Sequence, residues 1–528
     1  INCGVLQGAP LSPALYNIAT DFILDELTEP TISAKYGYQL VPHLPNLTCM
    51  GFADDTVIIA NNQENAAILT NMAKESFHEI GLQLNASKSV SINIVKGKIK
   101  HCPLIINNEF SIRSIEKHEK LRYLGIDFNE TLIFDSDKVV NDLKNSLDEL
   151  VNSPLLKVNQ KFQIINQFIW PTLIYPLQNA SSIKLPQSFL LNVDTIIKSA
   201  IKEILHLPSD TPDSVLYSPR KMKGLGIFRI EWEVTLQHLH ICRLLYKSAN
   251  TYITEIRNLE EEQKTCINKL QLTNIEDAHL KHPRELRNTL RLREYDKWCG
   301  LGLHGKGAVL YQEYTPANRW IESLHGVSTS EWIAALKLQY NMVPVRALPG
   351  RSRDGIRCRY CNETETLAHV LGSCPRSALL RNTRHHMIRS RIASALKQKK
   401  FEVYEEVSCI ADGGSSRRID IIAIDRNKNT AIILDPTVRC ESGAEQPNEV
   451  HLEKCKIYEP TIRYFQDFYK IQNITVMGLL IGARGSIPKF VVTALKNLGL
   501  GKELFLDLAL LSLKGSIQIV KNHLYNPF

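Results

Sequence analysis

The chain of 528 residues contains 44% hydrophobic and 22% charged residues, which are ordinary values for a globular protein of three to four domains. It has no apolar run of about 18 residues and no signal-peptide pattern, so neither a transmembrane helix nor secretion is expected. Its twelve cysteines form no regular framework, which predicts reduced thiols in an intracellular compartment. The net charge of +8 is informative only where the basic residues cluster.

A glycine-punctuated turn that leads into a helix is the first element of the chain. The run GVLQGAPLSP contains Gln7 and Gly8 in this turn. Ser12 is a suitable N-cap and Pro13 suits the first helical position, which predicts a helix over about residues 14–27.

Two adjacent carboxylates follow this helix. Asp54 and Asp55 lie between apolar runs at residues 47–50 and 56–60, a pattern that predicts a strand, a tight turn and a second strand. Adjacent carboxylates at the tip of a hairpin repel each other and are held together by divalent cations. The arrangement suits a two-metal phosphoryl transfer, although an ordinary solvated turn explains these residues equally well when they are taken alone.

Further helix and strand patterns come after the hairpin. An amphipathic helix is predicted over residues 65–80, and Gly81 stops it. Lys88 then leads into a strand, and residues 123–128, with the sequence YLGIDF, predict another strand.

In this order and spacing, the motifs resemble the second half of a reverse transcriptase palm, in the form found in non-LTR retrotransposons. The resemblance implies that Gln7 and Gly8 pack against the template and the incoming nucleotide, and that Lys88 belongs to the next nucleotide-binding motif. It also implies that Asp54 and Asp55 bind the catalytic magnesium ions.

The sequence departs from the family pattern in two respects. Ala9 replaces an aspartate that is not a metal ligand, so this change should be tolerated. The remaining metal-binding aspartate of the family belongs to an earlier motif, whereas this sequence starts at Ile1, inside a later one. We therefore expect the chain to be a fragment that cannot polymerise DNA alone, because two carboxylates cannot position both metal ions.

Apolar residues at three- and four-residue spacing dominate the middle of the chain. Residues 131–257 correspond by position to the helical thumb of the polymerase, after a palm at residues 1–130, and the charged stretch 258–349 predicts a helical linker. The candidate thumb helices cover residues 138–151, 160–169 and 192–205.

Four metal-binding side chains occupy a predicted zinc knuckle at residues 350–380. The spacing Cys358-x2-Cys361-x7-His369-x4-Cys374 can close a tetrahedron of zinc ligands. All four positions are filled by the protein, so such a zinc ion is expected to be structural. Unrelated cysteines are the alternative interpretation. The flanking arginines make contact with nucleic acid the natural role of the knuckle (Arg351, Arg353, Arg357 and Arg359).

A basic block follows the knuckle, with eight basic residues and no acidic one between positions 376 and 400. Such a block attracts phosphate through counterion release, although a solvated helix face is the alternative. The histidine pair His385-His386 is interpreted as facing phosphate. The residues predicted to bind nucleic acid are Arg376, Arg381, Arg384, Arg389 and Arg391.

A second pair of carboxylates lies in the C-terminal part of the sequence. Asp420 opens a predicted strand at residues 421–425, Asp435 ends the returning strand at residues 431–434, and the next helix carries Lys454. Two carboxylates on paired strands can bind a divalent metal that activates water on a phosphodiester, and a lysine can stabilise the charge that develops there. Taken without context, both are ordinary strand-end aspartates.

This arrangement resembles a restriction-enzyme-like endonuclease, in which the lysine has moved from the strand to the following helix, and it would occupy residues 381–528. Ile419 stands where the family usually has a proline, which leaves both carboxylates in place. Glu441 and Glu449 are possible additional metal ligands, but we do not include them in the site.

The order of palm, thumb, knuckle and nuclease resembles the polyprotein of a site-specific non-LTR retrotransposon that inserts into ribosomal RNA genes. We therefore expect a multidomain α+β fold with a C-terminal α/β nuclease. The resemblance implies target-primed reverse transcription, in which the nuclease nicks chromosomal DNA and the freed 3′-hydroxyl primes synthesis from dNTPs on element RNA. It also implies magnesium at both active sites, zinc in the knuckle and action in the nucleus.

Two alternatives stay open at this point. A self-splicing-intron maturase also joins a palm and a thumb to a DNA-cutting module, but its histidine-based nuclease is not found in this sequence. A decayed or domesticated element that only binds nucleic acid is the other alternative, and the intact acidic pairs argue against it (Asp54, Asp55, Asp420 and Asp435).

Overall fold

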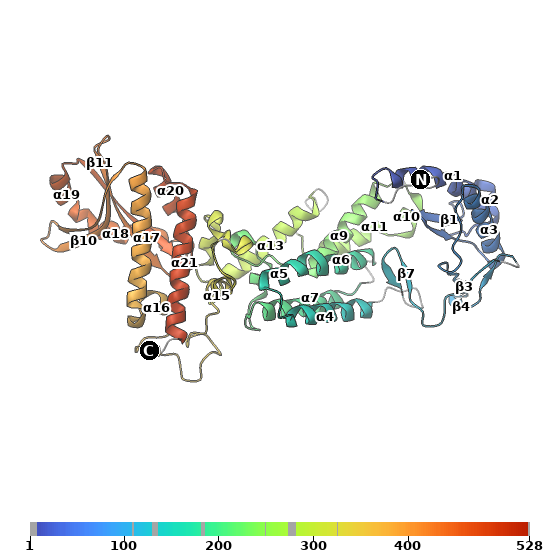
Figure 1. Cartoon of the computed structure of the whole chain (residues 1–528), viewed down its shortest axis with the longest axis horizontal. Helices are drawn as coiled ribbons and strands as arrows, with labels where there is room; N and C mark the ends of the chain where they lie inside the picture. Colours follow the sequence, from blue (N-terminus) through green and yellow to red (C-terminus); the bar gives the residue numbers. More distant parts are fainter. Residues whose placement is uncertain are drawn as a thin grey trace. The chain divides into compact units, whose positions relative to one another are not determined.

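The computed structural model describes residues 8–107, 110–128, 136–180, 185–248, 250–272, 281–324 and 326–525 (Figure 1). The chain divides into two compact units, each assembled from several stretches of sequence. The first unit contains residues 1–143, 172–186 and 234–280. The second unit contains residues 144–171, 187–233 and 281–528. The domain boundaries predicted from the sequence stay predictions.

The first unit begins with three helices around a β-hairpin, close to where the sequence predicts them. One core joins the apolar faces of α1 and α3 to strand β1, and its buried members are Ile23, Leu27, Cys49, Leu69, Ala73 and Phe77. Leu11 occupies the N-cap position of α1, so the cap predicted at Ser12 is displaced by one residue. The elements are α1 (Ser12–Thr28), α2 (Pro30–Tyr36), β1 (Cys49–Phe52), β2 (Asp55–Ile58) and α3 (Gln63–Glu79).

Three short hairpins follow, and one of them corrects the sequence prediction. Residues 123–128 do not form a single strand but a turn between two strands. The reason is the backbone at Leu124 and Gly125, with φ angles of 47° and 77°, which is the geometry of a tight hairpin turn. The hairpins are β3 (Asn93–Val95) with β4 (Lys98–Lys100), β5 (Leu104–Ile105) with β6 (Ser111–Ile112), and β7 (Leu121–Tyr123) with β8 (Ile126–Phe128).

The middle of the chain is helical, as the apolar spacing predicts. Its helices are α4 (Ser136–Asn152), α5 (Val158–Ile164), the π-helical turn η1 (Ile165–Ile169), α6 (Trp170–Asn179), α7 (Gln187–Ile204), α8 (Asp213–Tyr217), the 3₁₀ turn η2 (Arg220–Met222), α9 (Ile230–Tyr246), α10 (Thr251–Ile256) and α11 (Leu259–Lys269). Residues 273–280 of the predicted linker lie outside the described residues. Besides α11, the described part of that linker contains α13 (Pro283–Cys299), η3 (Ala308–Gln312), η4 (Thr315–Asn318), α14 (Trp320–Ser323) and α15 (Thr329–Gln339).

A four-stranded sheet with the order β12-β11-β10-β9 forms the C-terminal part of the second unit. Strand β11 pairs in parallel with β12, and the other neighbours are antiparallel. Strands β10 and β11 are longer than predicted, so Asp435 lies inside β11 rather than at its end. The strands are β9 (Glu402–Ile410), β10 (Ser416–Asp425), β11 (Thr430–Arg439) and β12 (Asn473–Gly482).

Helices cover both faces of this sheet (Figure 1). Side chains alternate along β10, so Ile421 and Ala423 pack against one helical layer while Ile422 and Ile424 pack against the other. The first layer contains α17 (Ala378–Gln398), α20 (Lys489–Asn497) and α21 (Lys502–Tyr525). The second layer contains α18 (Gln446–Tyr458) and α19 (Ile462–Tyr469). The small helix α16 (Leu367–Gly372) and the turn η5 (Pro375–Ser377) precede α17.

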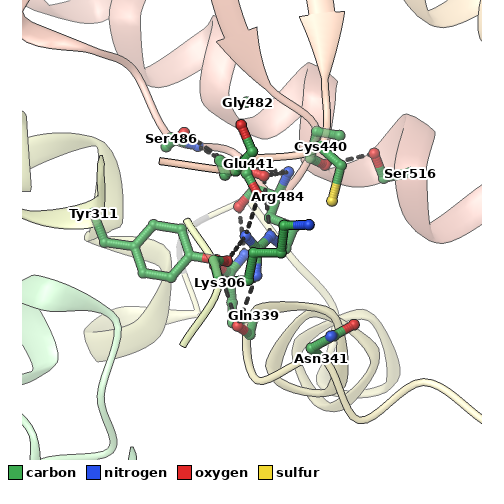
Figure 2. Close-up of polar contacts among 12 residues, drawn as sticks. Lys306, Tyr311, Gln339, Asn341, Cys440, Glu441, Gly482, Arg484, Ser486 and Ser516 are labelled. Atoms are coloured by element: carbon green, nitrogen blue, oxygen red, sulfur yellow. Dashed lines mark hydrogen bonds and ion pairs between the residues drawn. The ribbon is translucent and has the colours of Figure 1, made fainter. Parts of the chain in front are cut away.

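A buried ion pair joins this sheet to the linker helices of the second unit (Figure 2). Arg484, which is 2% exposed, follows β12 and donates from Nε to Oε2 of Glu441 at 3.0 Å. It also donates to the carbonyl oxygen of Lys306, at 2.5 Å from Nη2. Although burial by itself raises the pKa of Glu441, the charges of Arg484 and Lys223 hold it below its usual value. Because Glu441 is occupied in this way, it cannot serve as an extra metal ligand.

No helix among the described residues is both long and apolar enough to cross a membrane.

Candidate functional sites

The β1–β2 hairpin presents the first pair of carboxylates. Phe52 pairs with Asp55, so Ala53 and Asp54 form the turn, and Ala53 has a φ of 52°. Asp54 and Asp55 are both exposed. Strand β1 lies close to α1, because a Cβ atom on Gly51 would be 3.0 Å from Cδ1 of Leu24. The hairpin tip is therefore held at a fixed place against the first helix.

Two tyrosines show what surrounds each carboxylate. Burial and then the charge of Asp54 raise the pKa of Tyr16 on α1. Burial and then the charge of Asp55 raise the pKa of Tyr123 on β7. The fold thus brings together the helix, the acidic hairpin and the YLG strand, which are far apart in the sequence. Two exposed carboxylates in this setting can hold a divalent cation.

The structure says less about the other residues predicted for the polymerase site. Gln7 lies outside the described residues. Gly8 has a φ of +84°, a conformation that favours glycine. Lys88 is exposed, and its backbone N–H donates to Oδ1 of Asn85 at 3.1 Å. The nucleotide-binding roles of Gly8 and Lys88 stay predictions.

The predicted zinc ligands converge. The donor atoms of Cys358, Cys361, His369 and Cys374 all lie within 4.8 Å of one another. Sγ of Cys361 is 3.2 Å from Nε2 of His369, and the sulfurs of Cys358 and Cys374 are 3.9 Å apart. A zinc–sulfur distance of about 2.3 Å gives a tetrahedral edge of about 3.8 Å, so the four residues fit a zinc ion.

Local hydrogen bonds explain this convergence. A bridge between Arg357 and Thr364 closes the loop that carries the first two cysteines, and the Cys358 N–H donates to the Glu363 carbonyl at 2.7 Å. Thr366 caps α16, which positions His369 one turn before Cys374. Burial first, together with the neighbouring thiols, raises the pKa of Cys358 to about 12. A cation bound among such closely packed sulfurs would favour the loss of their protons to solvent.

For two arginines of the basic block, the structure contradicts the predicted contact with nucleic acid. Arg384 and Arg389 are buried on α17 and bonded to protein: Nη1 of Arg384 donates to Oγ of Ser516 at 2.8 Å, and Nε of Arg389 donates to Oε2 of Glu405 at 3.2 Å. Guanidinium groups in such positions do not face phosphate. The sequence analysis missed the burial of these two arginines because the number of charged residues does not show which face of a helix is buried.

The remaining three arginines are only partly buried, but each has a protein contact. Arg391 pairs with Asp507 at 2.7 Å, Arg381 donates to the carbonyl oxygen of Gly372, and the Arg376 guanidinium lies over the Tyr360 ring, 5.3 Å from its centroid. Their nucleic-acid contacts stay predictions. By contrast, Arg353 and Arg357 beside the knuckle are exposed.

The second acidic pair lies on neighbouring strands of the four-stranded sheet. Ile421 pairs with Leu434, so one step further along the same register Asp420 falls opposite Asp435. Asp435 is 4% exposed and accepts a hydrogen bond from Oγ1 of Thr437 at 2.8 Å. Nζ of Lys454 on α18 lies 3.2 Å from Oδ1 of Asp435. All three residues predicted for the nuclease are therefore brought together.

Two more side chains reach this site: His385, which the sequence analysis did not assign to it, and Tyr458, which lies one helical turn after Lys454 and was given no role. Nε2 of His385 on α17 lies 3.0 Å from Oδ2 of Asp420, and this hydrogen bond is the main cause that raises the pKa of His385. Burial, and then the charge of Asp435, raise the pKa of Tyr458 on α18. No spacing pattern could identify His385, because its contact with Asp420 depends on how α17 packs on the sheet.

The acidic sites and the knuckle differ in how many metal ligands they offer. Within the described ranges, groups of three or more candidate ligands gather only around Cys358. The Asp54–Asp55 and Asp420–Asp435 sites offer two carboxylates each. They suit magnesium, which is commonly held by one or two carboxylates together with water and substrate phosphates.

Residues 1–128 match the family model described as reverse transcriptase (RNA-dependent DNA polymerase). The chain therefore carries a reverse transcriptase domain, in agreement with the motifs around the acidic hairpin.

The chain is also a homologue of Pol polyproteins from R2 retrotransposable elements. It is 26% identical to the retrovirus-related Pol polyprotein from type-1 element R2 of Popillia japonica, over 82% of this chain and 89% of that protein. It is 26% identical to the type-2 element R2DM polyprotein of Drosophila melanogaster and to the type-1 R2 polyprotein of Nasonia vitripennis, over 85% and 93% of this chain. The chain spans only 39% and 45% of the length of the last two proteins.

Proposed function

We propose that this chain is the polymerase and endonuclease part of an R2-type retrotransposon Pol protein, acting by target-primed reverse transcription. The reverse transcriptase domain and the homologues support the polymerase half. The contact between Lys454 and Asp435, opposite Asp420, is the observation that carries the endonuclease half.

In the proposed nuclease, each residue has one task. Asp420 and Asp435 would hold a magnesium ion, and the chemistry such an ion would supply is the activation of water for attack on a phosphodiester. Lys454 lies against Asp435 and can also donate to a phosphate oxygen, where negative charge develops during cleavage. His385 holds the carboxylate of Asp420 in place. Cleavage leaves a free 3′-hydroxyl on the cut strand.

In the proposed polymerase, Asp54 and Asp55 would hold magnesium at the hairpin tip, and the ion would supply charge stabilisation for the oxygens of the phosphoryl transfer. The RNA of the element is the template, dNTPs are the substrates, and the nicked strand is the primer. The knuckle holds structural zinc, and the exposed Arg353 and Arg357 contact nucleic acid. A chromosomal target, expected in ribosomal DNA, places this activity in the nucleus.

The first test is nicking of a supercoiled plasmid that carries ribosomal DNA, in the presence of Mg²⁺. We expect the chain to relax the plasmid and Asp435→Ala to lose this activity. Asp467→Asn is a matched control, because Asp467 is an exposed carboxylate on α19, remote in sequence from both acidic pairs. Equal nicking by Asp435→Ala and the wild-type chain would remove the assignment of this site. Nicking by the wild-type chain would also exclude the alternative of a decayed element that only binds nucleic acid.

The hairpin is tested separately through its cation. Fe²⁺ in place of Mg²⁺, with ascorbate, generates hydroxyl radicals that cut the backbone next to the bound ion. We expect cleavage near residues 50–57, lost in the double variant Asp54→Asn/Asp55→Asn. Cleavage that persists in this variant would show that the cation binds elsewhere.

A further inference from the structure

The last turns of helix α21 place a buried histidine beside the knuckle. His523 is 0% exposed. Its Nε2 atom lies 3.9 Å from Sγ of Cys358, and its Nδ1 atom lies 3.9 Å from Sγ of Cys374. Two sulfurs of the candidate zinc site therefore face one imidazole ring that comes from 149 and 165 residues further along the chain.

A carboxylate holds this ring from the other side. Nε2 of His523 is 3.2 Å from Oε2 of Glu365, which is fully buried. Glu365 is in turn fixed by the N–H groups of Arg346 and Arg359, at 2.9 and 3.0 Å. The Tyr360 ring packs edge-on against the imidazole, with centroids 5.0 Å apart. Partners that orient the groups around a metal site in this way tune its affinity.

The same helix is bonded to the end of the nuclease sheet. Oγ of Ser512 donates to the Gly482 carbonyl at 2.7 Å, and Oγ of Ser516 donates to the Ala483 carbonyl at 2.5 Å. These carbonyls belong to the end of β12 and the residue after it, next to the buried Arg484 (Figure 2). Helix α21 also packs along α17, where a Cβ atom on Gly515 would lie 2.6 Å from Cγ of Arg384. One rigid helix thus connects the knuckle to the sheet.

We propose that His523 is an outer-sphere residue of the knuckle metal centre, and that zinc bound there stabilises α21 and, through it, the end of strand β12. The inference rests on the zinc assignment made in the proposed function. A zinc ion with three thiolates and one neutral histidine carries a net negative charge. With its proton on Nε2, the His523 ring directs this N–H between Oε2 of Glu365 and Sγ of Cys358, which relieves part of that charge while Glu365 keeps the ring in place. Losing zinc would therefore loosen the helix that supports the nuclease.

The test measures zinc and helix stability without using enzyme activity. Zinc content is measured by elemental analysis, zinc release by transfer to a chromogenic chelator, and amide hydrogen exchange is followed along residues 502–525. The variants are His523→Ala, His523→Gln, which keeps an N–H donor, and the control Lys521→Gln on the exposed side of the same helix.

We expect one zinc ion per wild-type chain, and zinc release about 10-fold or more faster in His523→Ala, with partial recovery in His523→Gln. Removing zinc from the wild-type chain should accelerate exchange in α21, including the turns around Ser512 and Ser516. A wild-type chain without zinc overturns the zinc assignment together with this inference. If the wild-type chain binds zinc but hydrogen exchange in α21 is the same with and without the metal, this inference alone is overturned. That result does not depend on whether the His523 variants fold.

Discussion

Nζ of Lys454 lies 3.2 Å from Oδ1 of Asp435, although one residue is on helix α18 and the other is inside strand β11. A glycine makes the approach possible. Gly478 on β12 pairs with Asp435, and a Cβ atom there would be 2.8 Å from the Cβ and Cγ atoms of Lys454. The helix can therefore lie directly over the sheet, with its lysine beside the carboxylate.

Replacing Lys454 should lower the rate of DNA cleavage without preventing folding. We expect Lys454→Met to lower the nicking rate by about 100-fold or more, because charge stabilisation at a developing oxyanion is typically worth this much. Lys456→Met is the matched control, since Lys456 is exposed on the same helix. The measurement is initial nicking rate in Mg²⁺, with circular dichroism of both variants. A larger loss of nicking in Lys456→Met than in Lys454→Met would show that Lys456, and not Lys454, supports cleavage.

Adding a methyl group at Gly478 should damage the same site through packing. We expect Gly478→Ala to lower the free energy of unfolding by about 1–3 kcal/mol, since the new Cβ atom meets both Lys454 and the backbone oxygen of Val450. Gly443→Ala should have little effect, because nothing lies within 4 Å of its Cβ position. Denaturant unfolding of both variants checks this. Equal stability of the two would contradict the close approach of α18 to β12.

The buried Glu441–Arg484 pair should matter far more than an exposed pair. We expect Glu441→Gln to destabilise the second unit by about 3–5 kcal/mol, because it leaves the Arg484 charge buried without a counter-charge. Arg439 and Glu453 form an exposed pair at 2.7 Å, so Glu453→Gln should cost about 1 kcal/mol or less. Chemical denaturation followed by tryptophan fluorescence compares the two. Similar losses would show that burial does not set the strength of these pairs.

His238 should make the first unit sensitive to acid. Its Nε2 atom is 3.1 Å from the Leu177 carbonyl oxygen, and burial lowers its pKa from 6.5 to about 4. Between these two values the unfolded chain binds a proton that the folded chain does not. The stability contributed by the neutral histidine is therefore fully present above pH 6.5 and is lost as the pH falls toward 4.

We expect His238→Gln, which keeps an N–H donor but cannot titrate, to lose less thermal stability than the wild-type chain between pH 7 and pH 4.5. Hydrogen exchange of α9 at both pH values localises the effect. An identical pH dependence in the variant would show that another group is responsible.

Much of the local structure could be predicted because it depends on short-range rules. The acidic hairpin follows from two apolar runs around Asp54 and Asp55, and the helices follow from apolar spacing. The candidate zinc ligands also lie close in sequence, so a loop and one helical turn are enough to gather them. The strand predicted over residues 123–128 was wrong because the sequence pattern did not reveal the left-handed conformation of Leu124.

Long-range packing decided the rest. Residue types and their spacing were enough to single out Asp420, Asp435 and Lys454 as candidates. The contact of His385 with Asp420 and the burial of Arg384 and Arg389 depend instead on how α17 packs in the assembled fold. The position of His523 beside the knuckle likewise depends on how α21 packs. The physical reason is that these contacts depend on which helix face is excluded from water, a property of the assembled core that no local spacing encodes.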